Sequence, residues 1–330
     1  MKVTVLGGGN WGTTVASLVA RRNDVLLWAR NAEVVDEINT EHTNSGYLPG
    51  ATLHRHLRAT ADFEEAIRHA DILIVGVPTG AVRDTAARSR EWIRPWIPVV
   101  SLAKGFEQGS LLRMTQVIAD ELPSHPVAAL TGPNIAKEII AGQAAASVVA
   151  TRDQSVAKAL QGVLSQGLFR VYSNHDVIGC ELGGALKNVV AIASGMAQGL
   201  GVGDNTRAGV MTRGLAELTR LGVAMGGEAQ TFAGLTGMGD LIATCTSPAS
   251  RNRSVGEKLG RGMSLDEITG GMTMVAEGIK TATTTHELAA RHSITMPIHE
   301  TIYQVVQGTM PPDQAYWGLG PRPGHESEPD

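Results

Sequence analysis

Short apolar runs rich in β-branched residues alternate with amphipathic helical stretches from Val3 to about Tyr172. This alternation is typical of β–α–β units, in which successive strands lie parallel in one sheet. Several runs are apolar at every position, which indicates strands covered by helices on both faces of the sheet. The predicted strands are Val3–Leu6, Val25–Trp28, Ile72–Val77, Val99–Ala103, Ala128–Thr131, Ser147–Ala150 and Phe169–Val171.

The second half of the chain has a different pattern. From Val177 onward no strand is evident, and Ala-, Leu-, Met- and Gly-rich helical segments such as Gly184–Gly199 follow instead. A chain of 330 residues also exceeds the roughly 250–300 that one hydrophobic core supports. We therefore predict an α/β protein with a doubly wound domain over residues 1–175 and an all-α domain over 176–317. A Gly-, Pro- and acid-rich tail over 318–330 is expected to be disordered.

Charge and cysteine content exclude several functional classes. A net charge of −4 gives no polycationic surface for nucleic acid or anionic lipid. No apolar run approaches the roughly 18 residues that cross a bilayer, and the first residues lack the pattern of a signal peptide. The two cysteines, Cys180 and Cys245, form no Cys-x-x-Cys pair, and the ten histidines do not cluster like ligands. We expect a cytoplasmic protein without a metal site.

A glycine motif follows the first predicted strand directly. Gly7, Gly9 and Gly12 form G-x-G-x-x-G at the start of a helix. The first glycine permits a tight turn, the second lets the backbone approach a pyrophosphate, and the third lets the helix pack closely on the strand. This context favours a Rossmann-type domain that binds a nicotinamide dinucleotide over a glycine-rich turn without a ligand.

Two residues near this motif are candidates for contact with the cofactor. The ring of Trp11 would cover the cofactor or pack on the second domain, and packing in the core is the alternative. Arg30 ends the second strand, where an NAD-selective site often has an acidic residue about 20 residues beyond the glycines. A guanidinium there can pair with a 2′-phosphate, so we expect both NADH and NADPH to serve. A solvated surface arginine is the other interpretation.

Further polar residues follow later strands. Lys104 comes after the strand that begins at Val99, and Gly132 and Asn134 come after the strand that ends at Thr131. Open α/β sheets bind ligands at the carboxyl ends of their strands, so Lys104 is a candidate ligand for an anion or a carbonyl group. Backbone N–H groups near Gly132 could hold substrate oxygens, although a plain Gly-Pro turn explains this segment equally well.

The helical half contains one lysine in unusual surroundings. Lys187, followed by Asn188, lies among small and apolar residues that leave little polar face to carry it to solvent. Burial would lower its proton affinity toward a range useful for acid–base catalysis. Asp240 and Arg251 lie in later glycine- and serine-rich turns and would supply a carboxylate partner and a phosphate-binding guanidinium.

Together these segments resemble bacterial-type NAD(P)-dependent glycerol-3-phosphate dehydrogenase over nearly the whole chain. The matching segments are Gly7–Thr13, Ser101–Gly105, Thr131–Pro133, Gly184–Asn188, Gly203–Thr206, Gly237–Leu241 and Ser250–Asn252. The resemblance implies reversible, NAD(P)H-dependent reduction of dihydroxyacetone phosphate to sn-glycerol 3-phosphate, the precursor of membrane phospholipids. It also implies an all-α second domain like the C-terminal domain of 6-phosphogluconate dehydrogenase, and it allows a homodimer.

The resemblance also assigns site residues by position. The implied cofactor-binding residues are Gly7, Gly9, Asn10, Trp11, Gly12, Arg30, Lys104, Ala136, Arg251, Val275 and Glu277. The implied substrate-binding residues are Lys104, Gly132, Asn134, Lys187, Asp240, Ser250, Arg251 and Asn252. The chain departs from the family at two of these positions, because Asn134 stands where Ser or Thr is usual and Asn10 where Ser is common.

The resemblance further implies a mechanism. Hydride passes from the nicotinamide to the ketone carbon while the Lys187 ammonium gives a proton to the developing alkoxide. Lys104 helps to orient the carbonyl, and Asp240 holds Lys187 in place. Arg251 with Asn252 grips the phosphate, whose binding energy also aligns the reacting carbon.

Two other functions remain open from the sequence. A β-hydroxyacid dehydrogenase also uses a lysine followed by asparagine on a helix, although the segments Gly237–Asp240 and Ser250–Asn252 favour the phosphotriose. A noncatalytic redox sensor that binds NAD(H) would have no need for a buried Lys187. Absorbance of NADH with candidate ketones separates these functions.

Overall fold

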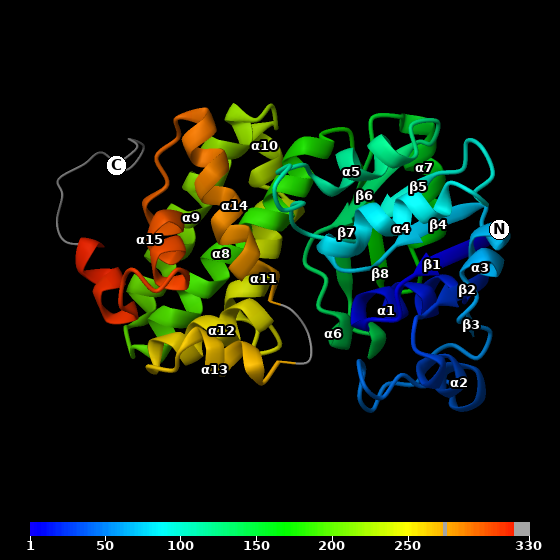
Figure 1. Cartoon of the computed structure of the whole chain (residues 1–330), viewed down its shortest axis with the longest axis horizontal. Coiled ribbons are helices and arrows are strands. Elements are labelled where there is room, and N and C mark those ends of the chain that lie inside the picture. Colours follow the sequence, from blue (N-terminus) through cyan, green and yellow to red (C-terminus); the bar gives the residue numbers. More distant parts are fainter. Residues whose placement is uncertain (273–275, 320–330) are drawn as a thin grey trace. The chain divides into compact units, whose positions relative to one another are not determined.

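The computed structural model describes residues 1–272 and 276–319. The chain divides into two compact units, Met1–Glu181 and Leu182–Asp330. The sequence placed the domain boundary at residues 175/176, whereas the division of the structure falls within helix α8 (Val177–Gly199). Figure 1 shows the strands in the first unit, and the described part of the second unit is helical.

The first unit is built on one eight-stranded sheet. Its strands are β1 (Lys2–Leu6), β2 (Asp24–Trp28), β3 (Arg58–Thr60), β4 (Ile72–Val75), β5 (Val99–Ser101), β6 (Val127–Thr131), β7 (Ala145–Ala150) and β8 (Phe169–Asn174). They lie in the order β3-β2-β1-β4-β5-β6-β7-β8. All seven predicted strands are present.

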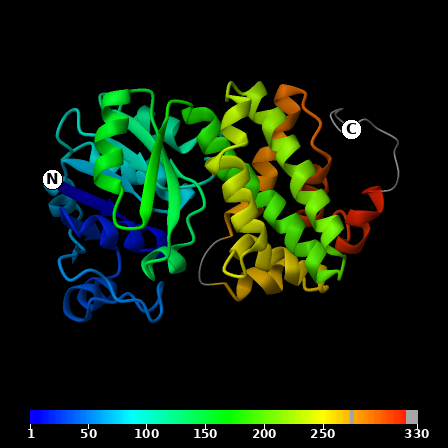
Figure 2. The ribbon, with the colours of Figure 1, turned by 180° about the vertical axis from the view of Figure 1, so that it is seen from behind.

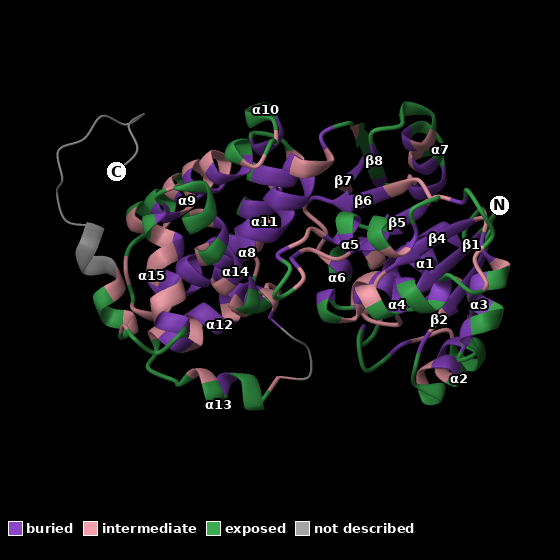
Figure 3. Ribbon diagram, turned by 45° about the horizontal axis from the view of Figure 1, so that its top comes forward, coloured by how far each residue is buried: buried purple, intermediate pink, exposed green. Residues whose placement is uncertain are grey.

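Helices cover both faces of this sheet, as the wholly apolar strands predicted. They are α1 (Asn10–Val19), α2 (Ala32–Glu41), α3 (Phe63–His69), α4 (Val82–Ser89), α5 (Met114–Glu121), α6 (Ala136–Ile140) and α7 (Gln154–Leu164), with the 3-10 turn η1 (Thr79–Ala81). Apolar residues of α1, α2, α6 and α7 pack with Val3 and Val5 of β1 in one cluster. Those of α3, α4 and α5 pack with Leu6 of β1 in a second cluster. The domain is therefore doubly wound (Figure 3).

Two features of the sheet differ from the sequence prediction. Strand β7 runs antiparallel to β6, with Leu130 opposite Val149. The helix between them, α6, has five residues and rises only about 7.5 Å. The chain therefore does not cross back to the amino ends of the strands before β7 begins, and β7 pairs antiparallel. The edge strand β3 was missed because its sequence, Arg-Ala-Thr, contains no apolar run.

The second unit consists of helices and the turns between them, with no strand among the residues that the structure describes. Its elements after α8 are α9 (Asp204–Ala224), α10 (Ala229–Phe232), the π-helical turn η2 (Leu235–Gly239), α11 (Asp240–Thr246), α12 (Arg251–Gly260), α13 (Leu265–Gly270), α14 (Glu277–His292), α15 (Pro297–Val306) and the 3-10 helix η3 (Pro312–Leu319). Helix η3 includes Gly318 and Leu319, the first two residues of the tail that the sequence predicted to be disordered. Residues 320–330 lie outside the described residues.

Helix α8 is buried along most of its length among the other helices of this unit, which Figure 2 shows from behind. By length and composition it could cross a membrane, with a mean hydropathy of 1.3 over an 18-residue window, although Glu181 and Lys187 interrupt its apolar residues. Within the structure, however, 94% of that window is buried in the protein. A core helix needs the same apolar composition, and a Cβ on Gly256 of α12 would lie 1.9 Å from the Ile192 carbonyl oxygen of α8. The two helices therefore pack backbone against backbone.

Candidate active site

The glycine loop has the geometry that the motif predicted. Gly7 has a φ of +122°, and its N–H donates to the Trp28 carbonyl oxygen at 2.9 Å. A Cβ on Gly12 would lie 2.1 Å from the Gly7 carbonyl oxygen. These contacts allow only glycine at the turn and at the close approach of α1 to β1.

The amino end of α1 faces open space. Gly9 is its N-cap residue, and a Cβ built on Gly9 would meet no atom within 4 Å. The first turn of α1 contains no acidic side chain. A helix N-terminus with free space beside it is suited to an anion, so this loop fits the pyrophosphate of a dinucleotide. The Asn10 carboxamide Oδ1 accepts from the Trp11 N–H at 2.7 Å, so Asn10 lies at the end of the helix that a ligand would approach.

Trp11 and Arg30, both predicted to bear on the cofactor, have different surroundings. The Trp11 ring packs edge-on to Phe169, with ring centroids 6.0 Å apart, and lies against the core cluster of the first unit. Its Nε1 is buried and has no hydrogen-bond partner among the described residues. Arg30 is exposed just beyond β2 and forms no hydrogen bond or ion pair with any residue that the structure describes. Its guanidinium is thus available to a ligand.

The residues after β5 and β6 form a second group in the same unit. The Lys104 Nζ donates to the Gly132 carbonyl oxygen at 2.7 Å, which joins the ends of these neighbouring strands. Both side-chain polar atoms of Asn134, and the Thr131 hydroxyl, are buried without a hydrogen-bond partner among the described residues. Ala136 is buried at the start of α6. Because buried polar groups normally find partners, the unpaired carboxamide of Asn134 is suited to a polar ligand.

Lys187 lies in the core of the second unit. Its side chain is 6% exposed, and its Nζ lies 3.1 Å from Oδ1 of Asp240, which is 2% exposed. The Nζ also donates to the Thr244 hydroxyl at 2.5 Å. That hydroxyl lies 2.6 Å from the Asp240 carbonyl oxygen and 3.2 Å from its Oδ1. One face of α11 therefore supplies two oxygen ligands to a single ammonium group.

A buried ion pair of this kind needs close geometry, because removing both charges from water opposes their attraction. The burial and the charges at this place also act on the pKa of Cys245, the residue after Thr244. Burial raises the pKa of its thiol to about 12, although the positive charge of Lys187 acts in the opposite direction. The thiol therefore stays protonated at neutral pH, and the charges that act on it are those of Lys187, Asp240 and Arg207.

Ser250 and Asn252, both predicted to bind the substrate, also make bonds that hold helices in place. Ser250 is the N-cap residue of α12, and its hydroxyl accepts from the Arg253 N–H at 3.2 Å. Asn252 Nδ2 donates to Asn188 Oδ1 at 2.9 Å, and Asn252 Oδ1 accepts from the Gly278 N–H at 3.0 Å. The Asn252 carboxamide thus connects α8, α12 and α14.

Arg251 begins α12 with an exposed surface. Desolvation by the surrounding atoms lowers the pKa of its guanidinium, and the nearby carboxylate of Glu277, the first residue of α14, opposes this shift. Arg251 and Glu277, both predicted to contact the cofactor, therefore lie close together. Val275, also predicted there, falls outside the described residues.

Sequence reasoning missed Thr244, although a pattern was present. Thr244 follows Asp240 by four residues, so on a helix the two lie on one face. The sequence showed Asp240 in a glycine-rich turn and gave no reason to extend a helix through Thr244.

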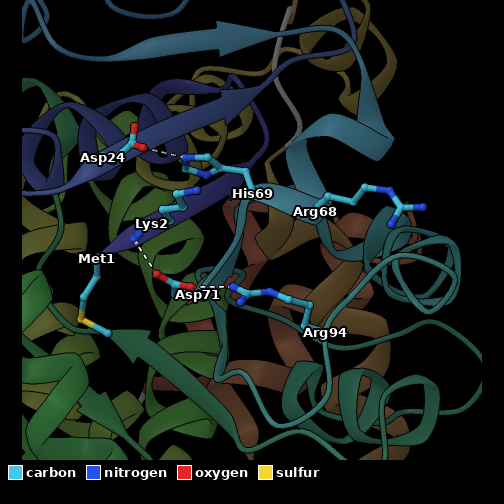
Figure 4. A pocket seen from close by; sticks show the side chains of 7 residues that line it. All are labelled: Met1, Lys2, Asp24, Arg68, His69, Asp71 and Arg94. Atoms are coloured by element: carbon cyan, nitrogen blue, oxygen red, sulfur yellow. Dashed lines mark hydrogen bonds and ion pairs between the residues drawn. The ribbon is translucent and has the colours of Figure 1, made fainter.

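A surface hollow elsewhere in the first unit is a poor candidate. Figure 4 shows it at the amino ends of β1 and β2. The glycine loop lies at the opposite, carboxyl end of β1. Its two carboxylates are already engaged, Asp71 by Arg94 at 2.5 Å and Asp24 by Arg58 at 2.8 Å. The hydrogen bonds from the Lys2 N–H and from Arg94 keep the pKa of Asp71 below its usual value.

Comparison with known proteins agrees with the features of both units. The family model for the N-terminus of NAD-dependent glycerol-3-phosphate dehydrogenase matches residues 2–157, and the one for its C-terminus matches residues 176–316. Glycerol-3-phosphate dehydrogenase (NAD(P)+) 2 of Sphingopyxis alaskensis is 58% identical over 319 residues, 97% of this chain and 96% of that protein. The corresponding protein of Mycobacterium avium is 52% identical over 327 residues, 98% of this chain and 96% of its own.

A solved structure extends the likeness to three dimensions. The crystal structure of glycerol-3-phosphate dehydrogenase from Coxiella burnetii matches with a TM-score of 0.91 at 35% identity, over 97% of this chain and 98% of that one. The resemblance predicted from the motifs is thereby confirmed, together with the α/β fold and the helical second half. This chain belongs to the NAD-dependent glycerol-3-phosphate dehydrogenase family.

Proposed function

We propose that this protein catalyses the reversible reduction of dihydroxyacetone phosphate to sn-glycerol 3-phosphate with NADH or NADPH. The observation that carries this proposal is the buried ammonium of Lys187, held 3.1 Å from Asp240 and 2.5 Å from Thr244. Reduction of a ketone needs a proton for the developing alkoxide, and a lysine held in this way can supply it. Family membership supports the choice of substrate and of cofactor.

When bound, the nicotinamide supplies a hydride to the ketone carbon, and the residues of this chain do the rest. The Lys187 ammonium gives its proton to the oxygen of the former carbonyl and recovers one in the next cycle. Asp240 keeps the ammonium positioned by charge, and the Thr244 hydroxyl fixes one of its N–H bonds. In the reverse direction the neutral amine removes the hydroxyl proton.

Other residues hold the substrate and the cofactor. We assign Lys104, Gly132 and Asn134 to the hydroxyl and carbonyl oxygens of the triose, because the Asn134 carboxamide is buried without a partner among the described residues. We assign the phosphate to Arg251 at the amino end of α12, with Ser250 and the second Nδ2 hydrogen of Asn252 beside it. The glycine loop and Arg30 are assigned to the dinucleotide.

The product indicates where the enzyme acts. sn-Glycerol 3-phosphate is the backbone precursor of glycerophospholipids, so we place the reaction in lipid synthesis. Cys180 and Cys245 are both buried and neither forms a disulfide, which agrees with a reducing cytoplasm. We also propose a homodimer on the family resemblance, which size-exclusion chromatography with light scattering tests.

A substrate panel tests the proposal directly. NADH or NADPH oxidation is followed by absorbance with dihydroxyacetone phosphate, dihydroxyacetone and a 3-oxoacid, and NAD(P)+ reduction with sn-glycerol 3-phosphate. We expect turnover of the phosphorylated triose with both cofactors and little with the other ketones. Preference for the 3-oxoacid would identify a β-hydroxyacid dehydrogenase, and NADH binding without turnover of any ketone would identify a redox sensor.

A further inference from the structure

Asn44 lies outside every motif discussed above, yet it contacts the glycine loop. Its side chain is wholly buried, with 0% of the residue exposed. The Asn44 Nδ2 donates to the Gly8 carbonyl oxygen at 2.9 Å and to the Thr13 hydroxyl oxygen at 2.9 Å. One carboxamide thus ties the loop before α1 to the first turn of α1, from a segment 36 and 31 residues further along the chain.

The bond to Gly8 fixes the direction of a peptide group. In a trans peptide the C=O and the following N–H point to opposite sides, and the described chain has no cis peptide bond. Because the Gly8 carbonyl points inward to Asn44, the Gly9 N–H points the other way. A Cβ on Gly9 would meet no atom within 4 Å, so space beside this residue is open.

Asn44 is itself held from both sides. The Thr43 hydroxyl and the Ser45 N–H both donate to Glu37 Oε1 of α2, at 2.7 and 2.6 Å. The Asn44 carbonyl accepts from the Leu48 N–H at 2.8 Å, and Leu48 is buried in the core cluster. The donor therefore has little freedom to move away from the glycine loop.

The Asn44 Oδ1 is buried without a hydrogen-bond partner among the described residues. An unpaired buried acceptor lowers stability, because it gives up its hydrogen bonds to water on folding and gains none in return. A side chain that served stability alone would stabilise the fold more if its oxygen were paired as well as its nitrogen. The two bonds donated by Nδ2, beside an unpaired Oδ1, instead favour a role that depends on the donated bonds.

We propose that Asn44 is a positioning residue for the dinucleotide, which holds the Gly8–Gly9 peptide so that the Gly9 N–H faces the pyrophosphate. This inference rests on the proposed function. Without Asn44 the Gly8 carbonyl loses its inward partner, the peptide group becomes free to rotate, and a smaller fraction of molecules has the binding-competent loop. The apparent Kd for the cofactor rises in proportion to that loss.

Asn44→Ala tests the proposal by titration of the variant with NADH and with ADP-ribose, which carries the pyrophosphate but no nicotinamide. We expect the Kd of both to rise by the same factor, roughly ten-fold, with KM for dihydroxyacetone phosphate and kcat at saturating NADH changed less than about two-fold. Asn44→Ser keeps a polar atom at the site but cannot reach both acceptors, and it replaces the alanine variant if that fails to fold.

Asn39→Ala is the matched control. Asn39 also makes two long-range bonds to the backbone of the same unit, donating to the Ala59 carbonyl oxygen at 2.9 Å and accepting from the Ala59 N–H at 2.8 Å, but it does not touch the glycine loop. Its Kd for NADH should match that of the wild type. Equal Kd values for Asn44→Ala and wild type, or an equal rise in Asn39→Ala, would overturn the role of Asn44. Wild-type protein that neither binds NADH nor reduces dihydroxyacetone phosphate would refute the proposed function instead.

Discussion

Replacing Lys187 by methionine removes the ammonium but keeps the apolar stem and much of the side-chain volume. The wild-type Nζ has two protein oxygens near it, Asp240 Oδ1 at 3.1 Å and Thr244 Oγ1 at 2.5 Å. A methionine thioether replaces neither contact, so the proton donor and the partner of the Asp240 carboxylate disappear together. The variant therefore has one chemical and one structural consequence, which have to be measured separately.

The loss of rate follows from the proposed role of Lys187, and the loss of stability follows from the burial of its ion pair with Asp240. A positioned general acid contributes roughly 10² to 10⁴ in rate, so kcat should fall by about that factor. Asp240 is 2% exposed, and breaking a buried pair by removing one partner typically lowers the free energy of unfolding by about 3–5 kcal/mol. The combined variant Lys187→Met with Asp240→Asn also removes the carboxylate charge that faces the ammonium in the wild type, and it should recover part of that stability without recovering the rate.

The assay combines denaturant unfolding, NADH titration and steady-state kinetics with dihydroxyacetone phosphate. We expect both variants to bind NADH with close to the wild-type Kd, because neither changes the glycine loop or Arg30, to which the dinucleotide is assigned, and we expect both to have the same low kcat. If folded Lys187→Met bound NADH and kept near-normal turnover, Lys187 would not be the proton donor, and Lys104 would be tested next.

Three further predictions concern other parts of the chain. Arg30→Asp should lower kcat/KM for NADPH relative to NADH by roughly 10- to 100-fold, since a charge-assisted bond to the 2′-phosphate is lost, and an unchanged ratio would make Arg30 a surface residue only. Arg251→Lys loses the planar fork and should raise KM for dihydroxyacetone phosphate by about ten-fold, with little change for dihydroxyacetone, whereas equal losses would assign Arg251 elsewhere. The free energy of unfolding should fall as pH rises above about 9, because the Cys245 thiol ionises there only in the unfolded chain while burial raises its folded pKa to about 12. Cys245→Ala should flatten that part of the pH profile, and an unchanged slope would contradict the assignment.

The sequence alone determined what depends on neighbouring residues. Seven strands followed from runs such as Ile72–Val75, because burial on both faces of a parallel sheet requires apolar residues at every position. The glycine motif predicted the turn at Gly7 and the contact of Gly12, because backbone sterics at such a turn depend on local residue type. Lys187 was recognised because the small and apolar residues around it leave little polar face to carry it to solvent.

Tertiary structure decided which distant groups meet. Lys187 bonds to Thr244, 57 residues away, and Asn44 to Gly8, 36 residues away, and no periodicity in the sequence encodes such pairings. The sequence likewise did not reveal that Asn252 is engaged by Asn188 and Gly278. The reason is physical: hydrophobic patterning specifies which face of an element is buried, whereas partners of buried polar groups depend on how whole elements pack against one another.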